Sequence, residues 1–373
     1  MSFLLNLTAA EFFKGAGYVI AALLCLMFMI VVHEFGHYIA GKIFKFKINE
    51  FAIGFGPALF KIKNKRNGEI FSVRLLPLGG FCAFAGEDGE AAEDVSTEGN
   101  FNSKPPWQRI IVLFSGALFN YISAMIIISI FFCAFGEILP SVRGTYDLYA
   151  DKDMTIVAEQ QLQEGDIICK IDGKNMYSLL DSSVFTEAIS DKESVDAVII
   201  RNGEKLTITL KKCYYISEAT SQEDVAAEAK YGFGISYAFT QHKLSFFGAV
   251  GHSFGFGWDV IELIFTSVGK VFTGSAKVSE TLGGTATAIA SLVEVTQHGF
   301  FAVMYAVCVL SASIAIMNIL PFPALDGSKI VFCIIEWIRG KPINRKVENI
   351  IHVVGLVLLL ALAIVLDILH FTG

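Results

Sequence analysis

The segment that decides the fold is GAGYVIAALLCLMFMIVVHEFGHYIA, residues 15–40, in which an apolar run leads directly into the pattern His33-Glu34-Phe-Gly-His37. The run carries no formally charged side chain before His33 and is long enough, with the motif, to cross a bilayer as one helix. On a helix, His33 and His37 are four residues apart and share a face, so both imidazoles can bind one metal ion. Glu34 lies beside that face, where a carboxylate can take a proton from a metal-activated water.

The motif alone leaves two interpretations open. His, Glu and His at these spacings recur by chance in unrelated helices, so a chance match is one of them. A chance match must also explain two imidazoles and a carboxylate at membrane depth, where ionisable groups are usually functional. The position of the motif therefore favours a metal site, and with it hydrolysis of a peptide bond within the bilayer.

The composition indicates an integral membrane protein with water-exposed parts. The 373 residues are 54% hydrophobic and 17% charged, with a mean hydropathy of +0.57. Such a chain is too apolar for an ordinary globular enzyme and too charged for a bundle of spans alone. The net charge of −7 gives no basic signature, so no nucleic-acid partner is expected. The seven cysteines contain no CxxC pair, which argues against a disulfide framework and a cysteine metal site.

Four stretches are apolar and long enough to span, which predicts a polytopic α-helical membrane protein embedded in the lipid bilayer. They cover roughly Gly15–Ala40, Ile110–Gly136, His298–Leu320 and Asn349–Leu366. The connecting segments 41–107 and 321–349 are rich in Lys and Arg, so the positive-inside rule places both in the cytoplasm. Both termini and residues 137–297 are then expected on the opposite side of the membrane.

Patterns between these spans divide the chain into four expected parts. Short alternating runs flank the turn at 66–69 and predict a β-hairpin, followed by a break at 76–80. A second hairpin pattern at 195–210 predicts a small β-rich domain, whereas 273–287 is expected to be a loop. The expected parts are an N-terminal membrane core (1–136) that includes a β-loop (45–85), a β-rich domain (137–240), an amphipathic, interfacial segment (241–297) and a C-terminal membrane core (298–373).

The β-loop itself has two interpretations. An exposed strand edge can receive an extended substrate by β-addition. A hairpin with a purely structural role explains the same pattern, and the sequence alone favours that simpler interpretation.

A catalytic zinc site normally has three protein ligands, so a third is needed beside the two imidazoles. Asp326 is the next candidate, at the end of Asn318-Ile-Leu-Pro321-Phe-Pro323-Ala-Leu-Asp326-Gly. An Asp at the tip of a span broken by two prolines can reach another helix at membrane depth. Irregular backbone is tolerated there only when it is buried in protein or lines a wet cavity. Taken alone, Asp326 is better explained as an interfacial helix cap.

Together, HEFGH in a first span and Asn-x-x-Pro-x-Pro-x-Leu-Asp-Gly after a later one resemble the site-2 protease family of intramembrane zinc metalloproteases. The resemblance is strongest to the bacterial branch with an extracytoplasmic PDZ domain, which acts in regulated intramembrane proteolysis. Further segments resemble this family in the right order, namely Gly54-Phe55-Gly56 in its membrane-associated β-loop, Gly116 and Asn120 in its GPxxN helix, and Gly165–Gly173 in a PDZ core. Ala117 departs from the pattern, since the family has proline there.

The resemblance implies one zinc ion held by His33, His37 and Asp326, with Glu34 as the catalytic base. It implies a multi-pass protein of a bacterial inner or plasma membrane that cleaves transmembrane segments of single-span proteins. Anti-sigma factors and remnant signal peptides, generally cut first by another protease, are such substrates. The resemblance also implies candidate substrate-binding residues: Asn318, Pro321, Pro323, Gly54, Phe55, Gly56 and Asn120.

Two other functions compete with proteolysis. A non-catalytic membrane scaffold or chaperone that retains the metal site has no need of a base, and the intact Glu34 argues against it. A metal transporter usually shows internal repeats and several broken helices, and this sequence shows no repeat. For the PDZ-like domain, binding of peptide C-termini and a role as a size filter both remain open.

Overall fold

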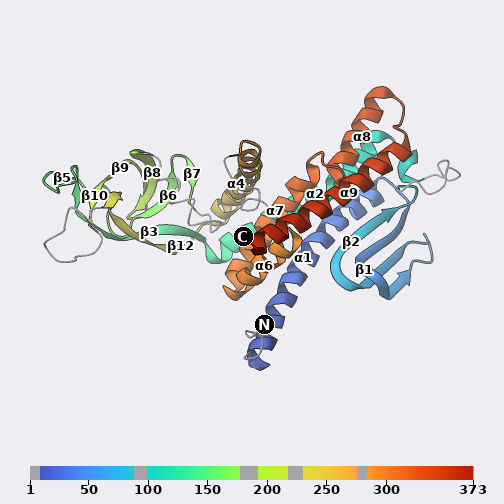
Figure 1. Ribbon diagram of the computed structural model, residues 1–373, viewed down its shortest axis with the longest axis horizontal. Helices are drawn as coiled ribbons and strands as arrows, with labels where there is room; N and C mark the ends of the chain where they lie inside the picture. Colours follow the sequence, from blue (N-terminus) through green and yellow to red (C-terminus); the bar gives the residue numbers. More distant parts are fainter. Residues whose placement is uncertain (1–8, 88–98, 177–191, 217–229, 275–283, 373) are drawn as a thin grey trace. The chain divides into compact units, whose positions relative to one another are not determined.

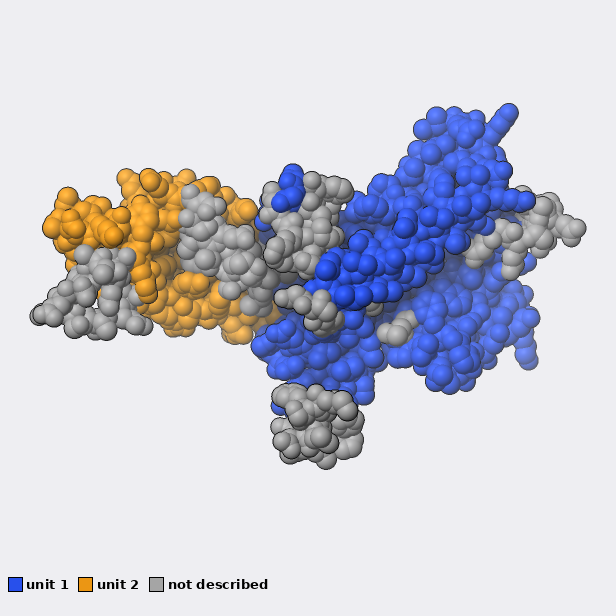
Figure 2. Space-filling model, viewed as in Figure 1, with its two compact units in different colours: residues 1–128, 253–373 blue, residues 129–252 orange. Residues whose placement is uncertain are grey.

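The computed structural model describes residues 9–87, 99–176, 192–216, 230–274 and 284–372 (Figure 1). The chain divides into two compact units, which Figure 2 shows in different colours. Unit 1 comprises residues 1–128 and 253–373, and unit 2 comprises residues 129–252. The candidate ligands His33, His37 and Asp326 all belong to unit 1.

Four helices in the described part of the chain are long and apolar enough to cross a membrane. They are α1 (Ala9–Ile43), α2 (Pro106–Phe135), α7 (Phe300–Ile319) and α9 (Arg345–Thr372). The four predicted spans are confirmed, with differences of a few residues at their ends, because hydropathy marks the apolar middle of a helix better than its polar ends. The chain is therefore a multi-pass membrane protein.

Close packing of α1 on α2 depends on a glycine inside the HEFGH motif. A Cβ at Gly36 would overlap the carbonyl oxygen of Ser115 and would lie 2.8 Å from its carbonyl carbon. Small residues allow helix backbones to approach within a membrane, where apolar burial gives no net drive for helices to associate. Gly36 thus lets the histidine-bearing turn of α1 lie directly against α2.

The described residues form further helices, of which the one that begins at Phe246 starts in unit 2 and continues into unit 1. They are η2 (Phe101–Ser103), α4 (Phe246–Phe272), α6 (Thr285–Gln297) and α8 (Asp326–Arg339). Along α4, Phe256 and Val260 are buried whereas Phe254 and Trp258 are exposed. An amphipathic, interfacial segment at 241–297 stays a prediction.

The predicted loop at 273–287 is wrong at its end, where α6 already begins, and its part at 275–283 lies outside the described residues. The cause is a cap from a distant helix. Asp367 of α9 accepts the backbone N–H groups of Ala286 and Thr287 at 3.0 and 2.9 Å. This carboxylate satisfies donors that are left free at a helix N-terminus.

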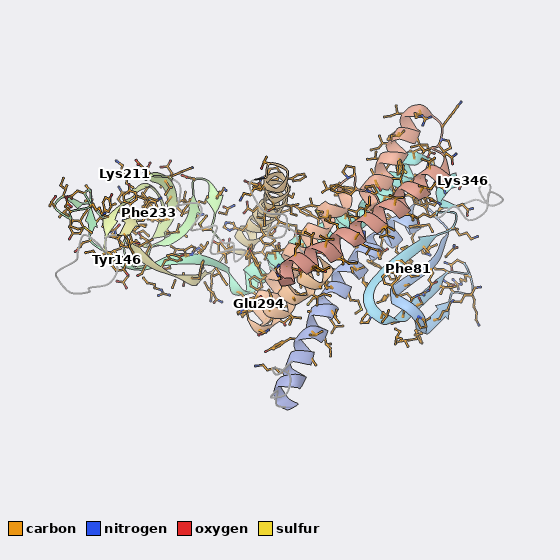
Figure 3. The ribbon with its side chains drawn as sticks, in the orientation of Figure 1. Phe81, Tyr146, Lys211, Phe233, Glu294 and Lys346 are labelled. Atoms are coloured by element: carbon orange, nitrogen blue, oxygen red, sulfur yellow. The ribbon has the colours of Figure 1, made fainter. Side chains whose placement is uncertain are left out.

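The β-loop folds as one hairpin, β1 (Ile48–Lys63) and β2 (Ile70–Phe84), whose strands each bend into two arms. The arm 48–53 pairs on one side with 70–73 and on the other with 80–84. The arm 58–63 pairs with 70–74, so one outer strand of the sheet is 80–84. Through that strand β2 packs against α1, and Phe81 within it is labelled in Figure 3.

The predicted break at 76–80 is wrong, because β2 continues through this stretch. The pairing register jumps there, since Phe55 pairs with Leu76 whereas Ile53 pairs with Gly80. Gly79, with φ +99°, allows the strand to bend without leaving the sheet. The sequence signals of Pro and Gly therefore marked a bend rather than an end.

In its described residues, unit 2 is built from short strands in two antiparallel sheets. One sheet has the order β12-β3-β6-β8-β9 with β7 beside β6, and the other has the order β11-β10-β4-β5. The strands are β3 (Glu137–Thr145), β4 (Leu148–Tyr149), β5 (Val157–Ala158), β6 (Ile167–Ile171), β7 (Lys174–Asn175), β8 (Ser194–Arg201), β9 (Glu204–Lys211), β10 (Cys213–Tyr215), β11 (Lys230–Gly232) and β12 (Ile235–His242).

The hairpin predicted at 195–210 is confirmed as β8 and β9, which pair from Ser194 with Lys211 to Arg201 with Glu204. Asn202 and Gly203 form its turn, both with positive φ (53° and 85°). Asn-Gly tolerates this conformation, which is why the dipeptide was an informative signal.

Candidate metal centre

Three side chains from distant parts of the chain meet at one point. The Nε2 atoms of His33 and His37 lie 3.1 Å apart. The Oδ2 atom of Asp326 lies 3.0 Å from His33 Nε2 and 3.2 Å from His37 Nε2. Both histidines are only 7% exposed. The two imidazoles come from one face of α1, and the carboxylate comes from the first residue of α8.

This donor set fits a catalytic zinc ion. Two imidazole nitrogens and one carboxylate oxygen, all within 4.8 Å of one another, match the three protein ligands of such sites, which leave a position for water. The ring of His37 is also oriented for binding, because its Nδ1–H donates to the carbonyl oxygen of Val112 at 2.8 Å. A carbonyl only accepts, so Nδ1 carries the proton and Nε2 offers its lone pair to a metal.

Asp326 reaches the histidines because α7 stops and α8 starts almost at once. A Cβ at Gly327 would overlap the carbonyl oxygens of Ile319 and Leu320, so only glycine lets α8 begin this close to the end of α7. The N-cap of α8 is Leu325, without a side-chain capping bond. The Asp326 carboxylate lies with the imidazoles rather than capping its own helix.

The space behind the two imidazoles is set by Gly116 of α2. A Cβ at this position would overlap His37 Nε2 and would lie 2.8 Å from His33 Cε1. Sequence reasoning placed Gly116 in a family-like motif but not in the site. A glycine in an uncharged span gives no local sign that it faces a ligand pair, so only the packing reveals its importance.

Glu34 is held by the β-loop. Its Oε2 accepts the backbone N–H of Cys82 at 2.9 Å, which joins α1 to the outer strand 80–84. Burial, with the nearby Glu34 carboxylate, raises the pKa of the Cys82 thiol. The thiol is therefore protonated at neutral pH, and the contact that the structure shows between Cys82 and Glu34 is made by the backbone N–H.

The candidate substrate-binding residues of the β-loop lie at its bend. Gly54 and Gly56, both with φ +86°, flank Phe55 where β1 turns from one arm to the next. The Phe55 ring stacks on Phe81 of the outer strand, with 6.2 Å between ring centroids. These residues shape the strand that contacts Glu34, and they make no hydrogen bond to His33, His37 or Asp326 in the described structure.

The remaining candidates lie on α2 and after α7. Asn120 is fully buried one turn beyond Gly116, and its side-chain amide has no hydrogen-bond partner among the described residues. Its backbone carbonyl accepts the Ser311 hydroxyl of α7 at 3.1 Å. Asn318 belongs to the last turn of α7, and Pro321 and Pro323 lie in the segment that leads to Asp326. None of them belongs to the cluster of three candidate ligands.

Comparison with known proteins connects this geometry to a family. The sequence model of peptidase family M50 matches residues 21–362 of this chain. A Fusobacterium nucleatum protein named as a zinc metalloprotease is 31% identical over 354 residues, which cover 93% of this chain and 96% of the relative. A Clostridium perfringens protein that is also named as a zinc metalloprotease is 30% identical, and the match covers 94% of this chain and 97% of the relative. The regulator of sigma-W protease RasP of Bacillus subtilis is 28% identical, and the match covers 93% of this chain and 96% of RasP.

Proposed function

Because the chain belongs to peptidase family M50, the site-2 proteases, and is a zinc metalloprotease, we propose that it cleaves transmembrane segments of single-span proteins within the bilayer. The observation that carries the proposal is the cluster of His33, His37 and Asp326, with Glu34 adjacent, on a helix that can cross the membrane. We further propose anti-sigma factors and remnant signal peptides as substrates, generally after a first cut by another protease.

His33, His37 and Asp326 would hold one zinc ion. Bound there, zinc supplies Lewis acidity, which lowers the pKa of water and polarises a carbonyl. Glu34 would take the proton from the attacking water and later pass it to the leaving nitrogen. The backbone N–H of Cys82 keeps the Glu34 carboxylate in place beside the two imidazoles.

A transmembrane substrate must unwind before its backbone can be cut, because a helix hides its carbonyls in its own hydrogen bonds. We propose that the outer strand 80–84 receives the opened segment by β-addition. The bend at Gly54, Phe55 and Gly56 would set the position of this strand through the contact of Phe55 with Phe81. Asn318, Pro321, Pro323 and Asn120 would contact the extended backbone from α2 and α7.

We also propose a location and orientation for the chain. The Lys and Arg residues of 41–107 and 321–349 favour a cytoplasmic position for these segments. Unit 2 would then be an extracytoplasmic PDZ-like domain, on the same side as both termini, in a bacterial inner or plasma membrane. The short antiparallel strands of this unit support a PDZ-like fold.

Metal removal tests the proposed activity. Treating the purified, reconstituted protein with a chelator is expected to stop cleavage of a single-span model substrate, and added zinc is expected to restore it. Activity falls because only three protein ligands would hold the ion and no step can begin without it. Zinc content by elemental analysis and product formation on gels give the two measurements. Full cleavage by a protein shown to be free of zinc would contradict the proposal.

Replacement of the Cys82 N–H tests the contact between the outer strand and Glu34. Cys82→Pro is expected to lower kcat/KM about two- to tenfold, since it removes the donor to Glu34 and a hydrogen bond contributes about 0.5–1.5 kcal/mol. Cys82→Ala keeps the donor and is the matched control, with kcat/KM close to that of the native protein. Zinc content is expected to be the same in both variants. Equal cleavage by Cys82→Pro and Cys82→Ala would show that the donor is not needed.

A further inference from the structure

The segment that delivers Asp326 contains a residue in a costly conformation. Ala324, two residues before Asp326, has φ +76°, in the left-handed region that favours glycine. Such a conformation costs about 1–3 kcal/mol for other residues and persists only where the surroundings impose it. Inside the segment, Leu325 N–H donates to the Phe322 carbonyl at 3.1 Å and closes a turn whose second central residue is Ala324, the position that has positive φ in a type II turn. The N–H of Ala324 itself is bound from outside this turn.

The outside support comes from α9. The N–H of Ala324 donates to His352 Nδ1 at 3.3 Å. One turn later on the same helix, a Cβ at Gly355 would overlap Pro323 and would lie 3.1 Å from its carbonyl carbon. The missing side chain at Gly355 therefore leaves room for Pro323, and the His352 imidazole accepts a hydrogen bond from the N–H of the next residue, Ala324. Together they seat the segment Pro323–Ala324 against α9.

The His352 ring is itself fixed in orientation. It packs edge-on against Phe332 of α8, with ring centroids 5.6 Å apart and planes at 75°. His352 also lines a cavity of about 250 Å³, together with Arg109, Lys329 and Glu348 among others. Because Nδ1 accepts a hydrogen bond, the ring proton is on Nε2. Nδ1 of His352 is thus bonded to the backbone of the segment that carries Asp326.

We propose that His352 is a positioning residue for the metal centre. By accepting the Ala324 N–H, it fixes the turn at Phe322–Leu325 against α9 and so places the Asp326 carboxylate within reach of His33 and His37. The inference rests on the proposed function, since it assigns His352 to the same zinc site, but His352 does not touch the three ligand atoms itself. Partners behind a metal ligand typically change metal affinity by about 10–100-fold when they are removed.

The test is a set of variants in which zinc affinity is measured by competition with a chelator, in detergent, on the full chain. His352→Phe keeps a ring against Phe332 but removes the acceptor, and is expected to weaken zinc binding about 10–100-fold. His352→Asn retains an acceptor at a comparable position and is expected to bind within a few-fold of native. Ala324→Gly removes the backbone penalty, so Ala324→Gly combined with His352→Phe is expected to recover most of the lost affinity.

The outcomes separate this inference from the proposed function. Native zinc affinity in His352→Phe would overturn the inference. So would an equal loss in His352→Phe with and without Ala324→Gly, because that result indicates a packing defect of α9. A native chain that binds no zinc would instead overturn the proposed function, and the inference with it.

Discussion

Gly116→Ala is expected to abolish zinc binding and, with it, all cleavage. The added methyl group would overlap His37 Nε2 and lie 2.8 Å from His33 Cε1, so the two imidazoles cannot keep their positions. They cannot simply retreat, because His37 is also tied to the Val112 carbonyl on the same helix as Gly116. Alanine is otherwise the better residue in a helix interior by about 1 kcal/mol, so the loss must come from the site.

The measurement is zinc content of the purified variant, with thermal unfolding as a check on the rest of the fold. Gly17→Ala is the matched control, since it is also a glycine in a span but has no atom within 4 Å of its Cβ position. That control is expected to retain zinc and activity. If Gly116→Ala bound zinc as tightly as native protein, the proposed ligand geometry would be wrong.

Glu34→Gln is expected to retain zinc. Its rate of cleavage is expected to fall by about 10²–10⁴-fold, the usual contribution of a general acid or base. The proposed ligands His33, His37 and Asp326 are unchanged. The amide oxygen of glutamine can still accept the Cys82 N–H, so the contact between α1 and the β-loop is preserved. Only the ability to take a proton is removed, which isolates the role of the base.

Zinc content and cleavage of a single-span model substrate in proteoliposomes are measured side by side for both forms. Undiminished cleavage by Glu34→Gln would exclude Glu34 as the base. A zinc-loaded native protein that cleaves none of a panel of single-span substrates would favour the scaffold alternative. Retained zinc with lost cleavage supports a protease whose base is Glu34.

Local patterns in the sequence were sufficient for the spans and for the histidine pair. Hydropathy is a property of consecutive residues, and the spacing of His33 and His37 follows from the helical repeat. Asp326 could be proposed because two prolines next to it break a span. The hairpin of β8 and β9 was predicted for the same reason, since Asn202 and Gly203 determine its turn locally.

Other features depend on contacts between distant segments and had no local signal. The start of α6 requires the carboxylate of Asp367, about eighty positions later. The contact of Glu34 with Cys82 and the support of Ala324 by His352 arise only when separate elements pack. The bend at 76–80 was misjudged because glycine and proline accompany both the end of a strand and a change of register.

The separation of the ligands along the chain has a consequence for biosynthesis. His33 and Asp326 are 293 residues apart, so the ligand set does not exist until α8 has left the ribosome. At synthesis rates of about 5–20 residues per second, that interval is about 15–60 s after the histidines appear. Under the proposed function, a nascent chain would therefore be inert towards the membrane proteins inserted beside it, and hydrolytic competence would begin only once most of the polypeptide has been made.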